Sequence, residues 1–404
     1  MYLLVCLFVA FICSNAERLT TDFSNDDIEA FIVNALKNNA TEAYDFSNAT
    51  DEICNPAMAT KPDFNVPGRR ISEAKCLEYI WEVKNIEDQI EADDKCRIYL
   101  ISQIKRGVIP EVFLFIPPTV IFGGRPAAPA EFPHMGAIGW RGNGQTKWVF
   151  KCGGSLISEK YVLTAAHCTW LSLMYHQDVV SNTPEVVRLG VENIEEDDFR
   201  INGDPVDMTI KRIITHPRYK SPKKYYDIAL IELVDKVKFA HNIHPACLWS
   251  KPPSQYLGQE GILSGWGVTE DGKQATVLQT AIVDMLKYSE CSPVLRNSWN
   301  RNWHGFAKHQ LCAGKLSGKV DSCQGDSGGP LQIKIDTGTN SSMNSVVGIT
   351  SFGIKCGQKD KPGIYTKVSS FLNWIEKTVW GTEEKEEVIK SLFKNKNLTF
   401  HRRT

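Results

Sequence analysis

Residues 321–330, DSCQGDSGGP, combine serine, glycine and aspartate in a way that suits nucleophilic catalysis. A serine hydroxyl is a weak nucleophile until a base takes its proton and nearby donors receive the negative charge that forms on the attacked carbonyl. Gly325, Gly328 and Gly329 would let the chain turn tightly and bring backbone N–H groups close to a substrate. Ser327 is therefore the candidate nucleophile, although a Gly/Ser-rich surface turn would have the same composition.

A base and an orienting carboxylate are present elsewhere in the chain. Of the nine histidines, only His167 lies in a stretch, LTAAHC, where small residues end an apolar strand, although a lone histidine is usually structural. Asp227 precedes an alternating strand in YYDIALIEL, where a partly buried carboxylate needs a cationic or hydrogen-bond-donating partner such as an imidazole. The chain order His, Asp, Ser matches one of the convergent arrangements of base, orienting group and nucleophile.

These residues lie in a segment that predicts an all-β domain. From Ile121 to about Trp380, short apolar or alternating runs are separated by Gly, Pro and Asp turns, which favours a β-barrel or sandwich. The apolar spacing in SSFLNWIEKTVW, residues 369–380, predicts a helix at its end. Residues 381–404 form a charged tail.

The part before this domain has a different composition. Residues 17–120 are rich in Asn, Asp, Glu and Lys, and residues 72–90 have helical apolar spacing, with Ser72 as a possible N-cap. Prolines and paired glycines in residues 108–133 indicate the boundary between this pro-region and the β-domain.

The first 16 residues, MYLLVCLFVAFICSNA, have the apolar run and small-residue end of a secretory signal. A membrane anchor is the alternative, but the run is short for a bilayer span of about 20 residues. Cys6 and Cys13 fall in this signal, so ten of the 12 cysteines remain, which favours disulfides in a secreted, extracellular protein. Four glycosylation sequons support secretion weakly and begin at Asn39, Asn48, Asn340 and Asn397.

Charge and histidine spacing argue against several other classes of function. The formal net charge is -1 and Lys and Arg form no long basic stripe, so we expect neither nucleic acid nor an anionic membrane as a partner. His241 and His244 have i, i+3 spacing in HNIH, but no third ligand is evident nearby. We expect no cofactor and no metal ion.

Six motifs together resemble the trypsin-like serine proteases. IFGG, LTAAHC, DIALIEL, LSGWG, CQGDSGGP and KPGIYTKV occur in the family's order across residues 121–380. The resemblance implies two six-stranded β-barrels with the active site between them, followed by the C-terminal helix. It also implies hydrolysis of peptide bonds by a serine endopeptidase.

The resemblance assigns a role to each candidate. His167 resembles the general base and acid, Asp227 the orienting carboxylate and Ser327 the nucleophile. The backbone N–H groups of Gly325 and Ser327 resemble the oxyanion hole, and Ser351 resembles the serine that hydrogen-bonds the aspartate.

The same resemblance implies a substrate preference. Asp321 stands where the trypsin branch places the carboxylate at the floor of its specificity pocket, and Gly353 and Gly363 match the glycines of the pocket wall. A buried carboxylate requires a cationic partner, so we expect cleavage after Arg or Lys. Val191 stands where a calcium-binding relative has an acidic ligand, so the acidic run at 195–198 is not expected to bind calcium.

Family members are made as zymogens, and the motif IFGG places the activating cut between Val120 and Ile121. The new ammonium of Ile121 would pair with Asp326, which precedes the nucleophile. A cut at Lys105 or Arg106 is the alternative, but its new terminus would begin too early to make this pair. Because Val120 is neither Arg nor Lys, an upstream protease is expected to activate the chain.

FPHMGAIGW, PACLW and GITSFG, with the apolar activation site, resemble the Snake-type branch of the insect clip-domain proteases. The resemblance implies other zymogens as protein substrates, a serpin-type inhibitor, and a place in a Toll, melanisation or clotting cascade of innate immunity. A clip domain has six cysteines, whereas residues 17–120 have only three, so the clip domain is degenerate or missing.

The resemblance also implies the disulfides. It pairs Cys152 with Cys168, Cys291 with Cys312 and Cys323 with Cys356, and it leaves Cys247 to tether the pro-region through Cys76. Cys54 with Cys96 is the pair that then remains. A non-catalytic regulator that uses the same fold to bind cascade partners is the alternative function, which the intact His167, Asp227 and Ser327 disfavour.

Overall fold

The computed structural model describes residues 59–381 apart from the internal gaps 106–126, 129, 145–146, 196–205, 253–254, 258, 269–272, 318–325, 337–341 and 354–359. The predicted signal, the asparagines of all four sequons, Cys54 and the tail beyond residue 381 lie outside the described residues. The chain divides into two compact units, one of residues 1–57 with 92–111 and one of residues 58–91 with 112–404. The second unit holds every candidate catalytic residue.

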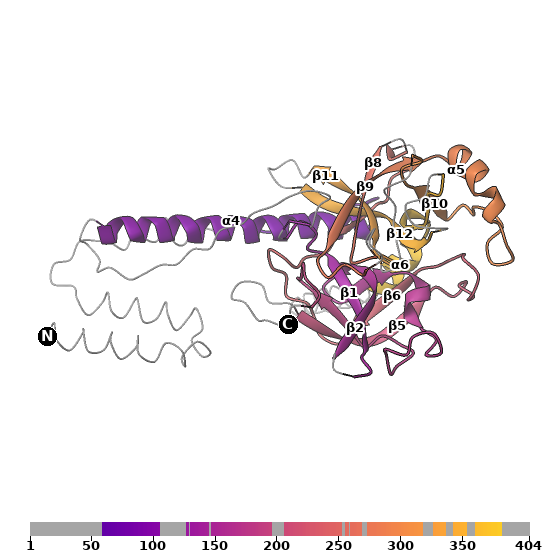
Figure 1. Ribbon diagram of the computed structural model, residues 1–404. Coiled ribbons are helices and arrows are strands. Elements are labelled where there is room, and N and C mark those ends of the chain that lie inside the picture. The colour runs from indigo at the N-terminus through magenta and orange to yellow at the C-terminus, as the bar shows by residue number, and fades with distance from the viewer. Residues whose placement is uncertain are drawn as a thin grey trace, which may run out of the picture. The chain divides into compact units, whose positions relative to one another are not determined.

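The first barrel of this unit is closed by antiparallel strands in the order β1-β2-β3-β6-β5-β4 (Figure 1). The strands are β1 (Met135–Arg141), β2 (Trp148–Ser158), β3 (Tyr161–Thr164), β4 (Val186–Leu189), β5 (Val206–Thr215) and β6 (Ala229–Leu233). β3 and β6 are wholly buried and mainly apolar, which is typical of strands inside a barrel wall. Gly154 on β2 allows β3 to approach closely, because a Cβ there would lie 2.7 Å from Cγ1 of Val162.

The second barrel uses the strand order β11-β8-β9-β10-β13-β12, and pairing of β11 with β12 closes it. The strands are β8 (Glu260–Gly265), β9 (Gln279–Leu286), β10 (Gln310–Ala313), β11 (Pro330–Asp336), β12 (Ser342–Phe352) and β13 (Gly363–Lys367). A short parallel strand, β7 (Cys247–Leu248), adds to β12. Helix α5 (Tyr288–Leu295) precedes β10, and α6 (Leu372–Val379) follows β13. The predicted all-β fold of two six-stranded barrels with a C-terminal helix is confirmed.

Helix α4 (Ile71–Lys105) is longer than the sequence predicted. It begins one residue before Ser72, and Oε2 of Glu73 accepts the backbone N–H of Arg70. Ser72 is therefore not the N-cap; its hydroxyl instead donates to Oε1 of Glu376 on α6 at 2.6 Å. The prediction of a Ser72 cap was wrong because this side chain has a partner in the protease domain.

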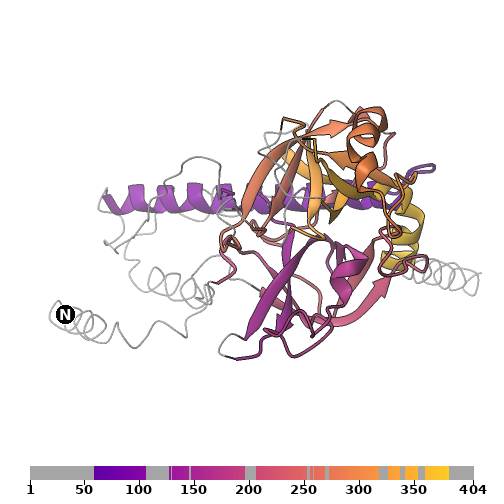
Figure 2. The same cartoon turned by 45° about the vertical axis from the view of Figure 1, so that its right-hand side comes forward.

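The first turns of α4 are fixed to the barrels of the same unit. Cys76 forms a disulfide with Cys247 on β7, and Tyr79 packs edge-on against Phe239 with ring centroids 5.7 Å apart. Figure 2 shows α6, in yellow, beside the start of α4, in indigo, where Arg70 pairs with Glu376 at 2.7 Å. Among the described residues, no helix combines the length and apolar character that crossing a membrane would require.

Candidate active site

Strand register brings His167 and Asp227 together. Thr164, the last residue of β3, lies opposite Ala229, the first residue of β6. The residues that follow β3 and those that precede β6 therefore meet at one end of the barrel. After β3 the chain enters a short 3-10 helix, Ala166–Thr169, which carries His167, and the disulfide between Cys152 and Cys168 fixes this turn to β2.

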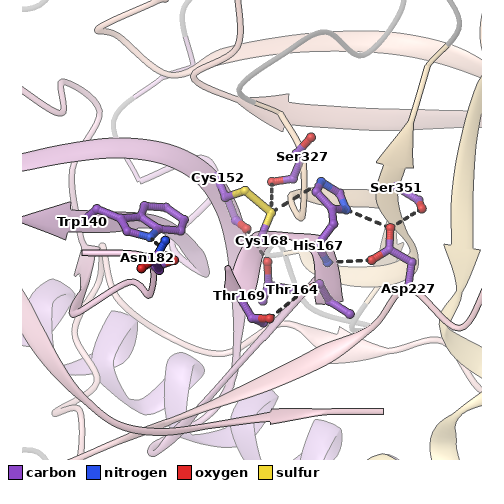
Figure 3. The surroundings of a disulfide bond; sticks show 12 residues. Trp140, Cys152, Thr164, His167, Cys168, Thr169, Asn182, Asp227, Ser327 and Ser351 are labelled. Atoms are coloured by element: carbon purple, nitrogen blue, oxygen red, sulfur yellow. Dashed lines mark hydrogen bonds and ion pairs between the residues drawn. A yellow bond between two sulfur atoms is a disulfide. The ribbon is translucent and has the colours of Figure 1, made fainter. Parts of the chain in front are cut away.

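The carboxylate of Asp227 holds His167 at two points (Figure 3). Its Oδ2 lies 2.8 Å from Nδ1 of His167, and its Oδ1 accepts the backbone N–H of the same residue at 2.9 Å. The hydroxyl of Ser351, on β12, also donates to Oδ2. Only 1% of Asp227 is exposed, so these donors replace the water that the carboxylate loses.

The electrostatics of this pair favour an ionised aspartate. Burial alone would raise the pKa of Asp227, but the adjacent His167 and hydrogen bonds from His167 and Ser351 outweigh burial and hold the pKa below its usual value. Because Oδ2 of Asp227 can only accept a hydrogen bond, Nδ1 of His167 carries the proton in the neutral ring. Nε2 is then the ring nitrogen that can act as a base.

Ser327 reaches the same place from the second barrel. Pro330 at the start of β11 lies opposite Ile349 on β12, so the turn before β11 lies beside the end of β12. The carbonyl of Ser327 accepts the N–H of Gly153 at 2.8 Å and lies 3.5 Å from Sγ of Cys168, while Nε2 of His167 lies 3.7 Å from that sulfur (Figure 3). Within the described part of the chain, the Ser327 hydroxyl makes no hydrogen bond to His167.

Gly328 is required by the turn that carries Ser327. Its φ is +80°, in the left-handed region, and its N–H donates to the carbonyl of Thr350 at 2.8 Å. A Cβ at this position would lie 2.2 Å from Oγ1 of Thr164 and 2.5 Å from the carbonyl oxygen of Gly153. Glycine therefore allows the turn to contact the first barrel directly.

The glycines of the LSGWG motif make room for Asp326. Oδ1 of Asp326 accepts the N–H of Gly267 at 2.9 Å. A Cβ would lie 2.2 Å from that oxygen if built at Gly265 and 2.5 Å from it if built at Gly267. Larger residues at either position would displace this carboxylate.

The remaining candidates are only partly described. Gly363 is buried in β13 and Gly353 is exposed just after β12. Val120, Ile121, Asp321 and Gly325 lie outside the described residues.

The structure contains the pairs Cys76–Cys247, Cys152–Cys168 and Cys291–Cys312, as the resemblance implied. Cys96 is also disulfide-bonded, whereas Cys54, Cys323 and Cys356 are not described.

Metal-ligating side chains cluster at one place in the described chain, where Cys152, His167 and Cys168 meet. Both cysteines are in a disulfide, so their sulfur atoms are not thiolate ligands. His244 is buried and its Nδ1 lies 3.4 Å from the Pro245 carbonyl, while His241 is exposed. Val191, which stands where a calcium-binding relative has an acidic ligand, packs against an apolar cluster.

The structure adds two supports for Asp227 that sequence reasoning missed. Oγ1 of Thr366 donates to the Asp227 carbonyl at 2.8 Å; this threonine lies in the quoted motif KPGIYTKV, which was the available signal. Tyr226 has a φ of +58°, which is unusual for an aromatic residue, and its N–H donates to Nε2 of His309 at 3.1 Å. Nothing in the local sequence indicated the second contact.

Comparison with known proteins places the chain in a family. The trypsin family model matches residues 121–375. Serine protease snk of Drosophila melanogaster is 36% identical over 82% of this chain and 69% of its own length. Phenoloxidase-activating factor 1 of Holotrichia diomphalia is 36% identical over 63% of this chain and 69% of its own length. CLIP domain-containing serine protease C9 of Anopheles gambiae is 31% identical over 65% of this chain and 69% of its own length. The chain therefore belongs to the trypsin-like serine proteases and is related to the clip-domain proteases of insects.

Proposed function

We propose that this chain is a secreted serine endopeptidase, made as a zymogen, that cleaves other extracellular proteins after Arg or Lys. The observation that supports it best is the contact of Asp227 with His167, which leaves Nε2 of the imidazole as the base. The backbone carbonyl of Ser327 lies 3.5 Å from Sγ of Cys168, and that nitrogen lies 3.7 Å from the same sulfur. A catalytic hydrogen bond is often long or poorly aligned before substrate binds, so the missing bond between the Ser327 hydroxyl and His167 does not argue against this role.

The reaction then uses each side chain in turn. Ser327 Oγ attacks the substrate carbonyl while His167 Nε2 takes the hydroxyl proton, and Asp227 stabilises the imidazolium through the Nδ1–H bond. Nε2 then gives this proton to the leaving amine as the C–N bond breaks, and the acyl group stays bound to Ser327 Oγ as an ester. Water activated by Nε2 hydrolyses that ester and restores Ser327.

Activation and specificity depend on residues beside this site. A cut between Val120 and Ile121 would free an ammonium whose pairing with Asp326 would shape the oxyanion hole formed by Gly325 and Ser327. The space that Gly265 and Gly267 leave around the Asp326 carboxylate supports this role. Asp321 would select Arg or Lys, with Gly353 and Gly363 as pocket walls.

The biological setting follows from the relatives. One of them is named as an activating factor for phenoloxidase, and another carries a clip domain by name. By analogy, this chain would act on other zymogens in an extracellular insect cascade, after cleavage by an upstream protease and under control of a serpin-type inhibitor. Residues 1–16 would be the signal, 17–120 the pro-region, 121–380 the protease domain and 381–404 the tail.

The test is turnover after a defined cut. In a variant whose residues 116–120 are replaced by an enteropeptidase site, cleavage would leave Ile121 as the new terminus. We expect hydrolysis of Arg- and Lys-ended ester substrates by the cut protein only, and none by the same protein with Ser327→Ala. Inactivity of the cut protein towards every substrate would favour the non-catalytic regulator. Turnover only after Phe would remove Asp321 from its assigned role.

A further inference from the structure

Two loops of the second unit carry positive charge without negative charge. Residues 213–226 contain four Lys or Arg and no Asp or Glu, and residues 296–309 contain three Lys or Arg and no Asp or Glu. The chain as a whole is nearly neutral, so this separation of charge is local. It was not evident as a basic stripe in the sequence, because about 70 residues separate the two loops.

The fold joins these loops. The N–H of Lys224 donates to the carbonyl of Asn302 at 3.1 Å, and Nε2 of Gln310 donates to the carbonyl of Lys224 at 2.7 Å. The hydroxyl of Tyr225 donates to the carbonyl of Gly305 at 3.0 Å. The cations of both loops therefore belong to one surface. We call Arg218, Lys220, Lys223, Lys224, Arg301 and Lys308 the basic surface.

None of these six side chains forms an ion pair with a carboxylate in the described part of the chain, and all but the half-buried Lys224 are exposed. Arg218 lies over the ring of Tyr226 at 4.2 Å and Lys224 over the ring of Phe352 at 5.5 Å. These contacts hold the Arg218 and Lys224 side chains in place without neutralising their charge.

His309, in the second loop, is affected both by burial and by the charges near it. Burial, followed by the charges of Arg218, His216 and Lys367, lowers the pKa of His309 to about 4. Arg218, a member of the basic surface, thus contributes to this lowering after burial. A carboxylate that binds there would be attracted by these cations, because no carboxylate in the described part of the chain pairs with them.

The same surface is hollowed between the two loops and helix α5. A cavity of about 370 Å³ is lined mainly by aromatic rings. The lining residues are Tyr225, Tyr288, Ser292, Trp299, His304, Gly305, Phe306 and Ala307. Tyr225 belongs to the loop of the basic surface and is two residues from Asp227, so the cavity and the cations are neighbours of the catalytic site. The cavity fits an apolar side chain flanked by acidic residues.

We propose that the basic surface and its aromatic cavity form a docking site for an acidic, aromatic-containing segment of the protein substrate. This inference rests on the proposed function for its biological meaning. Position supports a substrate segment as the occupant: the Lys224 ammonium lies over Phe352, which directly follows Ser351, the donor to Asp227. A segment bound here is thus held close to the bond to be cut, and it would raise the local concentration of that bond.

Binding can be measured without catalysis. The full-length chain with Ser327→Ala is titrated with fluorescein-labelled deca-glutamate, and with the same peptide carrying one central Phe, by fluorescence anisotropy. The patch variant combines Lys220→Glu, Lys223→Glu and Lys308→Glu. The matched control combines Lys147→Glu, Lys251→Glu and Lys377→Glu, three exposed lysines elsewhere with the same change in net charge.

We expect both peptides to bind the Ser327→Ala protein, the Phe peptide more tightly, with affinity falling as salt rises. The patch variant should bind each at least about tenfold more weakly, while the control keeps its affinity apart from a small change due to net charge. Equal loss in both variants, or no binding, would overturn the proposal. Equal affinity for the two peptides would show that the aromatic cavity is not part of the docking site. A heparin oligosaccharide that binds the basic surface far more tightly than either peptide would reassign the surface to a polysaccharide.

A kinetic measurement separates this proposal from the proposed function. The cut protein is assayed with two peptides that share one cleavable Arg bond, of which one carries an added acidic segment. We expect the acidic extension to raise kcat/KM in the wild type and the control, and to give no increase in the patch variant. If neither peptide is cut but the binding results hold, the docking site stands and the endopeptidase activity fails.

Discussion

Oδ2 of Asp227 lies 2.8 Å from Nδ1 of His167, and Oδ1 of the same carboxylate binds the backbone N–H of that histidine. Two hydrogen bonds to one residue fix both the position of the main chain and the orientation of the ring. The ring therefore cannot turn over without losing its bond to a buried carboxylate, a loss that costs several kcal/mol. The tautomer with Nε2 free is set by this geometry.

Replacing Asp227 by Asn should lower kcat of the cut enzyme by about 10⁴-fold, because an amide group can donate to Nδ1 and so stabilise the wrong tautomer. The measurement is kcat and KM on an Arg ester, with KM expected to change little. Asp235→Asn, at an exposed aspartate, is the matched control and should keep full activity. An Asp227→Asn enzyme with near wild-type kcat would remove the proposed orienting role.

Gly328→Ala should destabilise the fold by about 3 kcal/mol or more, because the new methyl group would overlap Thr164 Oγ1 and the Gly153 carbonyl. Gly68→Ala is a matched control: its φ of +84° is close to the +80° of Gly328, but nothing lies within 4 Å of its Cβ position. The control should be destabilised only by backbone strain, by about 1 kcal/mol. Thermal and urea unfolding of both variants measures the difference. Similar losses would mean that strain alone, without the contact to the first barrel, requires glycine at 328.

The sequence predicted those parts of the fold in which apolar spacing reports burial. The runs YVLT and ALIEL form strands, as their patterns predict. ALIEL is nevertheless buried throughout, Glu232 included, although alternation predicts one exposed face. Helix α4 was predicted to end near residue 90 but continues to Lys105, and Ile98, in the added part, is 64% exposed. Periodicity detects a buried face, and a helix that lacks one gives no such signal.

The candidate site shows a similar division. Motifs supplied the residues that touch one another through strand register, such as His167 and Asp227. They did not supply Tyr226 with His309, whose rings stack 4.1 Å apart although 83 residues separate them in the chain. Contacts between distant loops depend on the packing of both barrels, and a local pattern carries no information about them.

The disulfide between Cys76 and Cys247 should hold the two products of activation together. After a cut between Val120 and Ile121, non-reducing electrophoresis should give one band and reducing electrophoresis two. With Cys76→Ser and Cys247→Ser combined, two bands should appear under both conditions. A single non-reducing band in that double variant would show that another covalent link joins the products. The ion pair of Arg70 with Glu376 is non-covalent and would not survive the detergent.

Buried neutral histidines should make the fold less stable in mild acid. Burial, with the charge of His244, lowers the pKa of His134 to about 3, and burial lowers that of His244 to about 4. Between an unfolded pKa near 6.5 and these values the unfolded chain binds more protons, so stability falls as pH falls from about 6.5 to 4, by up to about 1.4 kcal/mol per pH unit for each histidine. Urea unfolding at several pH values measures this slope. His134→Gln and His244→Gln should each flatten it, whereas the depressed pKa of Asp227 acts only in stronger acid. An unchanged slope in both variants would show that other groups take up the protons.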